Sequence, residues 1–240
     1  MTDEVPTMTA FIMVEPDGQN RIIVAPGALE HVTASDAMRF APENASADVC
    51  LVSLQIAVDA AVATIQIAYG AGTKTIPNPA PAVLLPQSIW SAVDYLTPNE
   101  TEAAAITSLP SEASAPELLD GLRKPTRAVI VLTLGEQGAY LDEGDSRRLY
   151  PAPHVELVVD TTGAGDAFLA AFATAIAEGQ DPADAVVFHT PCDATAMRLT
   201  KATVGGNASA CSCHSSVCRQ KSRDAPMHPG LSRRGKLNYW

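Results

Sequence analysis

Hydrophobic and polar positions change their period several times along the chain, and each change predicts a new element. Apolar runs at 48–54 (DVCLVSL) and 127–134 (RAVIVLTL) have the length of buried strands. The alanine-rich segment 57–72 is typical of a helix that ends at glycine, and a second such helix is expected at 167–178. Further strands are expected within 73–82, within 93–106, where a helix also starts, and at 154–160.

Strands that alternate with helices over this length predict an α/β fold with a mostly parallel sheet and helices on both faces. In such sheets, ligands bind outside the carboxyl ends of the strands. The start of the chain differs, because two apolar runs flank the turn-rich EPDGQN and predict a β-hairpin over residues 9–26. We therefore expect a hairpin within residues 1–31, an α/β domain at 32–205 and a tail at 206–240.

The composition indicates a folded protein and disfavours some classes of binding partner. Of the 240 residues, 47% are hydrophobic and 18% are charged, which suffices to bury a substantial core. The net charge of -11 disfavours binding to nucleic acid or to an anionic membrane. No apolar run is long enough to span a membrane, and the first residues lack the basic region of a secretory signal. These features predict a cytoplasmic protein, with the nucleus as an alternative location.

The last part of the chain has a different composition. Residues 219–240 hold six basic residues and one acidic residue, with no periodicity of either kind. Three of the five cysteines lie just before them, in CSCHSSVC. Cys211, Cys213, His214 and Cys218 could be zinc ligands, but one residue separates the first pair where structural sites usually have about two to four. We expect the alternative, which is a disordered tail with free thiols.

The segment DTTGAGD at 160–166 holds more glycine and aspartate than a strand-to-helix turn requires. Its small residues stand at the first turn of the next helix, where unpaired N–H groups and the helix dipole attract an anion. Asp166 beside an anion is unfavourable unless its carboxylate acts as a base while the helix start stabilises a transferring phosphoryl group. Alternatively, Asp160 or Thr162 caps the helix, Gly165 allows close packing and Asp166 favours the dipole.

Four segments, in this order, resemble the ribokinase, or PfkB-type, family of sugar kinases. They are NPAPA at 78–82, TPNETEA at 97–103, TLGEQGAYL at 133–141 and DTTGAGDAF at 160–168. The resemblance covers roughly residues 10–190 and is greater to ribokinases than to adenosine or fructose kinases. It implies a ribokinase-like fold, in which the hairpin is a remnant of a lid, and ATP-dependent phosphorylation of D-ribose at its 5-hydroxyl.

The resemblance also implies a role for each matching residue. Asp166 would be the general base toward the sugar hydroxyl, and Gln55 would contact the sugar. Asn99 and Glu102 would act around Mg²⁺ and the triphosphate, although these two residues could equally cap a helix. The anion hole would consist of the amides of Gly163, Ala164 and Gly165, and a monovalent-cation (K⁺) site of Asp160 and Thr162. Thr133, Gly135 and Gly138 would line the nucleotide, or form an ordinary strand-end turn.

Several positions depart from the family pattern. Gln55 and Leu29 stand where ribokinases have a glutamate and an asparagine, which weakens contacts with the sugar. The family's glycine-rich first segment has no counterpart, and the match decays past Phe188. We therefore expect a chain truncated at its start, divergent at its end and poor as a ribose kinase. The alternatives are a kinase for another sugar or nucleoside, and a noncatalytic nucleotide-binding fragment that pairs with another subunit. A homodimer is a further option.

Overall fold

The computed structural model of the protein describes residues 5–14, 20–153, 163–187 and 237–239. The helices, and the 3-10 helices η1 to η3, are η1 (Gly27–His31), α1 (Ala34–Arg39), α2 (Ala41–Ala45), α3 (Val58–Gly70), η2 (Gln87–Ala92), α4 (Glu100–Thr107), α5 (Ala115–Arg123), η3 (Gly135–Gln137) and α6 (Ala164–Ala177). The strands are β1 (Thr9–Val14), β2 (Asn20–Ala25), β3 (Val49–Ser53), β4 (Lys74–Asn78), β5 (Tyr95–Leu96), β6 (Val129–Thr133), β7 (Ala139–Asp142), β8 (Arg147–Tyr150) and β9 (Leu237–Tyr239).

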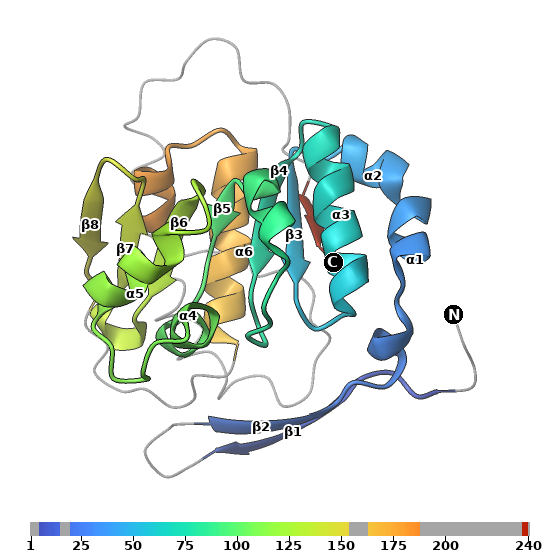
Figure 1. The fold of residues 1–240 in the computed structure, drawn as a ribbon, viewed down its shortest axis with the longest axis horizontal. Coiled ribbons are helices and arrows are strands. Elements are labelled where there is room, and N and C mark those ends of the chain that lie inside the picture. The colour runs from blue at the N-terminus through green and yellow to red at the C-terminus, as the bar shows by residue number, and fades with distance from the viewer. Residues whose placement is uncertain (1–4, 15–19, 154–162, 188–236, 240) are drawn as a thin grey trace, which may run out of the picture.

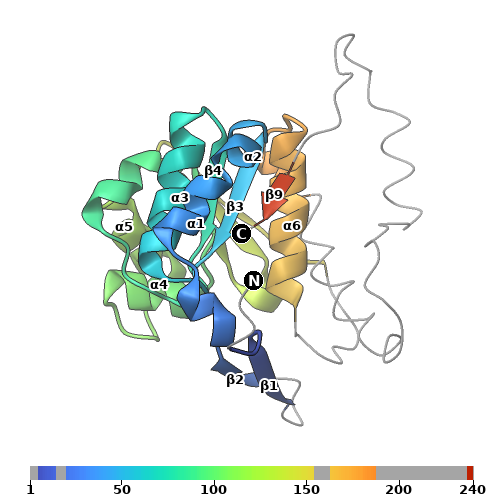
Figure 2. The same cartoon turned by 90° about the vertical axis from the view of Figure 1, so that its right-hand side faces the viewer.

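The strands of the α/β body form one layer between helices, with α1 to α5 on one side and α6 on the other (Figure 2). Two hydrogen-bonded sheets make up the layer, with the strand orders β4-β3-β9 and β5-β6-β7-β8. The pairs β3–β4, β3–β9 and β5–β6 are parallel, whereas β6–β7 and β7–β8 are antiparallel. The predicted sheet with helices on both faces is therefore confirmed.

Side chains, rather than a backbone ladder, connect the two sheets where β4 lies beside β5. Asp94 precedes β5, and its carboxylate accepts hydrogen bonds from the Thr75 amide (2.9 Å) and from Nζ of Lys74 (3.3 Å). At the other end of the same boundary, Nδ2 of Asn78 donates to the carbonyl oxygen of Thr97 (3.1 Å). These bonds hold β4 and β5 side by side at both of their ends.

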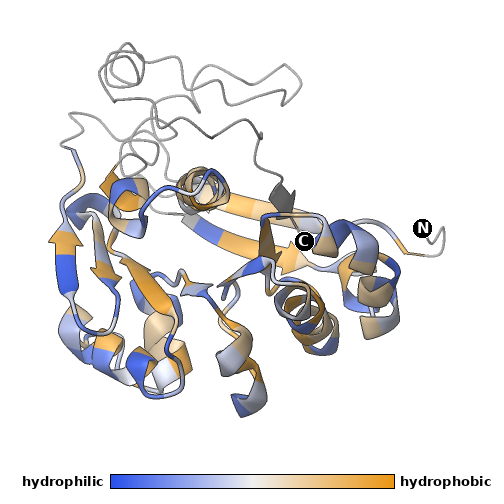
Figure 3. Ribbon diagram, turned by 90° about the horizontal axis from the view of Figure 1, so that it is seen from above, coloured by the Kyte–Doolittle hydropathy of each residue, from blue (hydrophilic) through white to orange (hydrophobic). Residues whose placement is uncertain are grey.

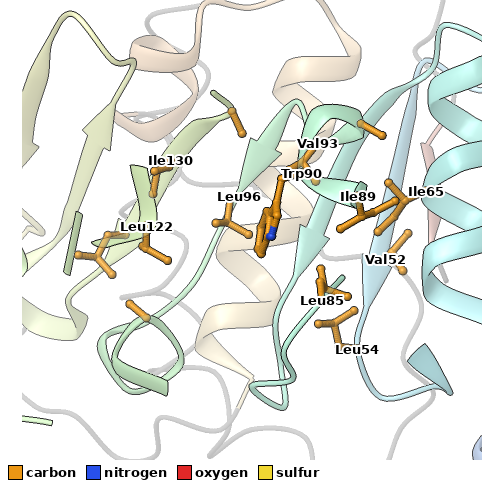
Figure 4. Close-up of a cluster of buried hydrophobic side chains, with 14 of the residues drawn as sticks. Val52, Leu54, Ile65, Leu85, Ile89, Trp90, Val93, Leu96, Leu122 and Ile130 are labelled. Carbon is orange, nitrogen blue, oxygen red and sulfur yellow. The ribbon is translucent and has the colours of Figure 1, made fainter. Parts of the chain in front are cut away.

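The strands are apolar because both of their faces are buried. On β3, Cys50 and Val52 belong to the core beneath α3, α4 and α5, whereas Val49 and Leu51 belong to the core beneath α6. Figure 4 shows part of the first core, where Trp90 of η2 lies near Leu96 and Val93. Seen from above, hydrophobic strands lie between helices in which polar and apolar residues are mixed (Figure 3). Period-two alternation therefore sorts the side chains of each strand between two cores.

The predicted hairpin is confirmed as the antiparallel pair β1–β2, which extends beyond the α/β body (Figure 1). Phe11 stands opposite Ile23, and Ile12 stands opposite Ile22 on the other face. All four side chains are at least 42% exposed. The hairpin thus presents apolar residues on both faces.

A buried ion cluster joins α5 to β7. Asp142 is 2% exposed, and its carboxylate accepts hydrogen bonds from the guanidinium of Arg123, from Nε of Arg147 (2.9 Å) and from the Gly144 amide (2.8 Å). Arg123 also donates to the carbonyl oxygen of Ala128 (2.7 Å). Burial raises the pKa of Asp142, but the Gly144 amide and the two guanidinium groups outweigh it, so the pKa lies below its ordinary value.

Three residues of the expected tail form β9, which pairs with β3 in the register Val49↔Leu237 and Leu51↔Tyr239. The sequence pattern did not predict this strand. The expected strand at 154–160 and the four residues considered as zinc ligands lie outside the described residues. Within the described ranges, no three acidic, histidine or cysteine side chains gather as a metal site would require. None of the helices described has the length and apolar character of a membrane span. The boundaries of the three expected parts stay predictions.

Candidate active site

The carboxyl ends of β3, β4, β5 and β6 lie at one edge of the layer, together with the first residues of α4 and α6 (Figure 1, lower edge). Tyr95 on β5 makes an edge contact with Phe172 on α6, with ring centroids 5.6 Å apart. Phe168 lies one turn earlier in α6 and stacks on Phe172 (6.1 Å). Because α6 runs opposite to β5, its N-terminus reaches the carboxyl edge, where ligands bind in sheets of this kind.

The start of α4 is fully capped by two of the predicted site residues. Oδ1 of Asn99 accepts a hydrogen bond from the Glu102 amide (2.8 Å). The Glu102 carboxylate accepts bonds from the backbone amide and from the side-chain amide of Asn99 (both 2.9 Å). The capping interpretation of this pair is therefore confirmed, and the proposed magnesium role remains a prediction.

The start of α6 is built differently. Gly163 occupies the N-cap with φ of +77°, a conformation that favours glycine, and it has no side chain to accept a bond from the first amides. By contrast, α1, α4 and α5 each begin with a capping box. A Cβ added at Gly163 or Gly165 would meet no described atom within 4 Å, so close packing does not explain the small residues. No side chain among the described residues caps the first amides of α6, which suits an anion site.

Asp166 lies in the first turn of α6, and its side chain is exposed. The negative charge of Asp166 affects Glu102, which lies in the first turn of α4. Burial is the main cause that raises the pKa of Glu102, and the negative charge of Asp166 raises it further against the bonds from Asn99. The carboxylates of Glu102 and Asp166, which the sequence separates by more than sixty residues, are therefore near enough to interact electrostatically.

The turn after β6 lies beside the start of α4. The Thr133 amide donates to the carbonyl oxygen of Pro98 (3.0 Å), and Thr133 forms an isolated bridge with Asn99. Gly138 has φ of +103°, and a Cβ there would lie 2.0 Å from the carbonyl oxygen of Tyr150. The fold alone thus requires glycine at 138, as expected of a strand-end turn. Gly135 has φ of +54° and open space around it, and its nucleotide role remains a prediction.

The other predicted residues fall at the same edge or outside the described ranges. Gln55 is exposed just past β3, and Leu29 is half-buried in η1. Asp160 and Thr162, predicted to hold a monovalent cation, lie outside the described residues. No role was predicted for Asn78 or Thr97, although Asn78 is the polar last residue of β4 and Thr97 directly follows β5, in the segments NPAPA and TPNETEA.

The donors at this edge fit a nucleotide-bound Mg²⁺ better than a metal held by protein alone. Both carboxylate oxygens of Glu102 already accept hydrogen bonds from Asn99. The described residues also provide no cluster of three metal-binding side chains. Mg²⁺ usually keeps several waters and is bound through one or two carboxylates together with substrate phosphates. Glu102 and Asn99 suit that arrangement.

Comparison with known proteins places this site in a family. The family described as pfkB family carbohydrate kinase matches residues 1–201. The ribokinase of Schizosaccharomyces pombe is 32% identical over 197 residues, which are 80% of this chain and 62% of that protein. The deoxyribokinase of Salmonella typhi is 32% identical over 172 residues, covering 68% of this chain and 54% of the relative. The chain therefore spans less than two thirds of the length of these relatives.

A solved structure shows the same fold. The ribokinase of Arabidopsis thaliana, complexed with ribose and ATP, superposes with a TM-score of 0.70 at 28% identity. The match covers 85% of this chain and 65% of that one. The predicted α/β fold is thus confirmed at the level of a fold family.

Proposed function

The chain belongs to the pfkB family of carbohydrate kinases, and we propose that it transfers the γ-phosphoryl group of ATP to a primary hydroxyl of ribose or a closely related sugar. One observation carries the proposal: Asp166 stands in the first turn of a helix whose amides are uncapped, within electrostatic reach of Glu102. A carboxylate beside an anion site suits a reaction that removes a proton while negative charge develops nearby.

In the proposed mechanism, the carboxylate of Asp166 accepts the proton of the sugar hydroxyl as that oxygen attacks the γ-phosphorus. The bond from the γ-phosphorus to the β–γ bridging oxygen breaks, and ADP leaves. The amides of Gly163, Ala164 and Gly165 stabilise the negative charge on the transferring phosphoryl oxygens. Gln55 contacts the sugar from the end of β3, and Thr133, Gly135 and Gly138 line the nucleotide. When bound, Mg²⁺ neutralises charge on the phosphates, and Asn99 and Glu102 would hold it through phosphate and water. Asp160 and Thr162 would hold K⁺.

The sugar itself is open to a direct comparison. The ribokinase of Schizosaccharomyces pombe and the deoxyribokinase of Salmonella typhi have the same identity to this chain, 32%. We propose D-ribose as the acceptor because the ribokinase match is longer, at 197 residues against 172. ADP release with D-ribose, 2-deoxyribose and a nucleoside, each at equal concentration, tests this choice. A higher kcat/KM with either of the other acceptors would reassign the substrate, and no release with any of the three would contradict the kinase activity.

Nucleotide binding is expected to be measurable without any sugar. ATP with Mg²⁺ should raise the melting temperature by mass action, because it binds the folded chain at the ends of β5 and β6. The stabilisation should reach about 2.7 kcal/mol when ATP is at about a hundred times its Kd. Calorimetric titration and thermal unfolding measure it. The absence of both heat and a thermal shift at millimolar ATP would contradict the nucleotide site.

We also propose that two copies of the chain associate through the hairpin. The hairpin can lay at most one face on its own α/β body, but Ile12 and Ile22 line one face while Phe11 and Ile23 line the other. An isolated two-stranded hairpin is marginally stable in water, so its second apolar face needs cover. A second hairpin supplies a matching surface.

Ile22→Lys is expected to convert a dimer into a monomer, because the charge would be buried opposite Ile12 at the interface. Sedimentation velocity at micromolar protein measures the change. Met38→Lys is the matched control, since Met38 is 60% exposed on α1 rather than on the hairpin. A wild-type chain that sediments as a monomer, or an Ile22→Lys variant that remains a dimer, would contradict the proposal.

A further inference from the structure

At the carboxyl ends of β3, β4, β5 and β6, short polar side chains follow the apolar side chains of the strands. On β3 and β4, Leu51 and Ile76 pair with each other and belong to the core beneath α6. Two residues further on, Ser53 and Asn78 pair in the same register, on the same face. Thr97 follows β5 beside Asn78, and Thr133 ends β6 two residues further along the ladder, paired with Asn99. The core beneath α6 therefore ends in a polar row.

The register of β5 on β6 fixes the face on which Thr97 lies. Tyr95 pairs with Val129, and the bridge of Asn99 with Thr133 keeps the same offset. Thr97 accordingly stands beside Val131, whose side chain belongs to the core beneath α6. Because paired residues of a parallel ladder point to the same face, the Thr97 side chain points to the α6 side of the sheet.

Thr97 also lies at the level of the first turns of α6. It is two residues, or about 6.6 Å, beyond Tyr95 along the strand. Phe168 is one turn, or about 6 Å, from Phe172, the residue that contacts Tyr95. Gly165 is less than a turn further toward the edge. The side chain of Thr97 therefore faces α6 at about the level of Phe168, within one turn of Gly165.

The Thr97 hydroxyl is buried and has no partner. The residue is 4% exposed, and Oγ1 makes no hydrogen bond to any described residue. The other polar side chains of this row each donate a hydrogen bond to a backbone carbonyl. Oγ of Ser53 donates to Ala80 (3.1 Å), and Nδ2 of Asn78 donates to Thr97 (3.1 Å). Oγ1 of Thr133 donates more weakly to Pro98 (3.5 Å). A buried unpaired hydroxyl destabilises the folded chain, so the fold gains nothing from a threonine here.

We propose that the Thr97 hydroxyl is a hydrogen-bond donor to the phosphoryl group that occupies the start of α6. This inference rests on the proposed function for the identity of the anion. The amides of the first turn approach the phosphoryl oxygens from the helix, and Thr97 donates from the sheet beneath them. Donors on two sides orient the phosphoryl group and also stabilise its negative charge, and a fixed orientation favours in-line transfer.

The distinguishing variant is Thr97→Val, which replaces the hydroxyl with a methyl of similar volume. Without ligand, its melting temperature is expected to rise, because an unsatisfied polar group leaves the core. Its affinity for inorganic phosphate should fall about tenfold or more, the scale of a lost hydrogen bond to a charged group. Thr97→Ser keeps the hydroxyl and should bind phosphate as the wild type does. Calorimetric titration with phosphate alone, and thermal unfolding with and without phosphate, provide the readouts.

Thr126→Val is the matched control at the opposite end of β6. Thr126 is also 4% exposed, but its Oγ1 donates to the Trp90 carbonyl (3.2 Å) and accepts from the Ala128 amide (3.0 Å). This variant should lose stability and keep its phosphate affinity. Opposite signs of the thermal shift in the two variants would separate a ligand-binding hydroxyl from a structural one.

Three outcomes would overturn the inference: a wild-type chain that does not bind phosphate, a Thr97→Val variant that binds it equally well, or a Thr97→Val variant that loses stability as Thr126→Val does. The proposed function fails separately, when no sugar elicits ADP release. Selective loss of phosphate affinity in Thr97→Val would support the inference even then, because the titration requires no turnover.

Discussion

Asp166→Asn is expected to lower turnover by about a hundredfold or more, while the affinity for ATP changes little. Asparagine keeps the shape of the side chain and its place in the first turn of α6, but it cannot accept the proton of the sugar hydroxyl. The loss should appear in kcat and in kcat/KM alike, because a general base acts in the transition state rather than in substrate binding. Steady-state ADP release, together with calorimetric titration of ATP, measures both quantities.

Asp145→Asn is the control for this substitution. Asp145 is an exposed aspartate in the turn between β7 and β8, and its exchange removes the same charge without touching the carboxyl edge. Its turnover should equal that of the wild type. If Asp166→Asn turned over equally well, Asp166 would be a helix-start residue that favours the dipole, and the base would have to be sought elsewhere.

Asp142→Asn is expected to lower the free energy of unfolding by about 3 kcal/mol, the lower end of the range for breaking a buried ion pair. The change leaves the guanidinium groups of Arg123 and Arg147 facing a neutral amide, in a cluster where the carboxylate is 2% exposed. Chemical denaturation measures the loss. Asp120→Asn removes an exposed partner of the same Arg147 and should cost less than about 1 kcal/mol. Equal losses in the two variants would show that burial of the cluster contributes nothing.

The same carboxylate gives stability a defined pH dependence. The pKa of Asp142 is lower in the folded chain than its ordinary value of about 3.9. Its contribution is therefore complete above about pH 4, and it is lost as the pH falls through the lower, folded-state pKa. Between pH 5 and pH 2, unfolding curves of Asp142→Asn should lose less stability than those of the wild type, because one proton-linked group is gone. Parallel losses would contradict this assignment.

Local patterns in the sequence predicted most of the fold. The apolar run at 127–134 predicted β6, the turn-rich EPDGQN predicted the hairpin, and glycine at 70–72 predicted the end of α3. The helices α1, α2 and α5 were missed, although α1 and α5 each carry a local signal. Thr33 with Asp36, and Ser114 with Glu117, form capping boxes that mark the starts of α1 and α5.

Features that depend on distant residues were beyond such patterns. Asp142 meets Arg123 only because β7 returns beside α5, and Gly138 is required only because Tyr150 passes close to it. The segment of β9 has three residues, too few for any period to be recognised. In the site, the resemblance supplied Asp166 and Glu102, whereas the unpaired hydroxyl of Thr97 follows only from the register of β5 on β6.

The boundary between β4 and β5 has an evolutionary consequence. It divides the carboxyl edge into two units: Gln55, proposed for the sugar, stands after β3, and Asn99 and Thr133, proposed for the nucleotide, stand on the β5–β6 side. Side chains such as Asp94 and Asn78, rather than a shared ladder, connect the units. Substitutions that remodel one unit therefore leave the backbone pairing of the other intact. A chain built in this way can acquire a new acceptor in small steps while inheriting its phosphate chemistry unchanged.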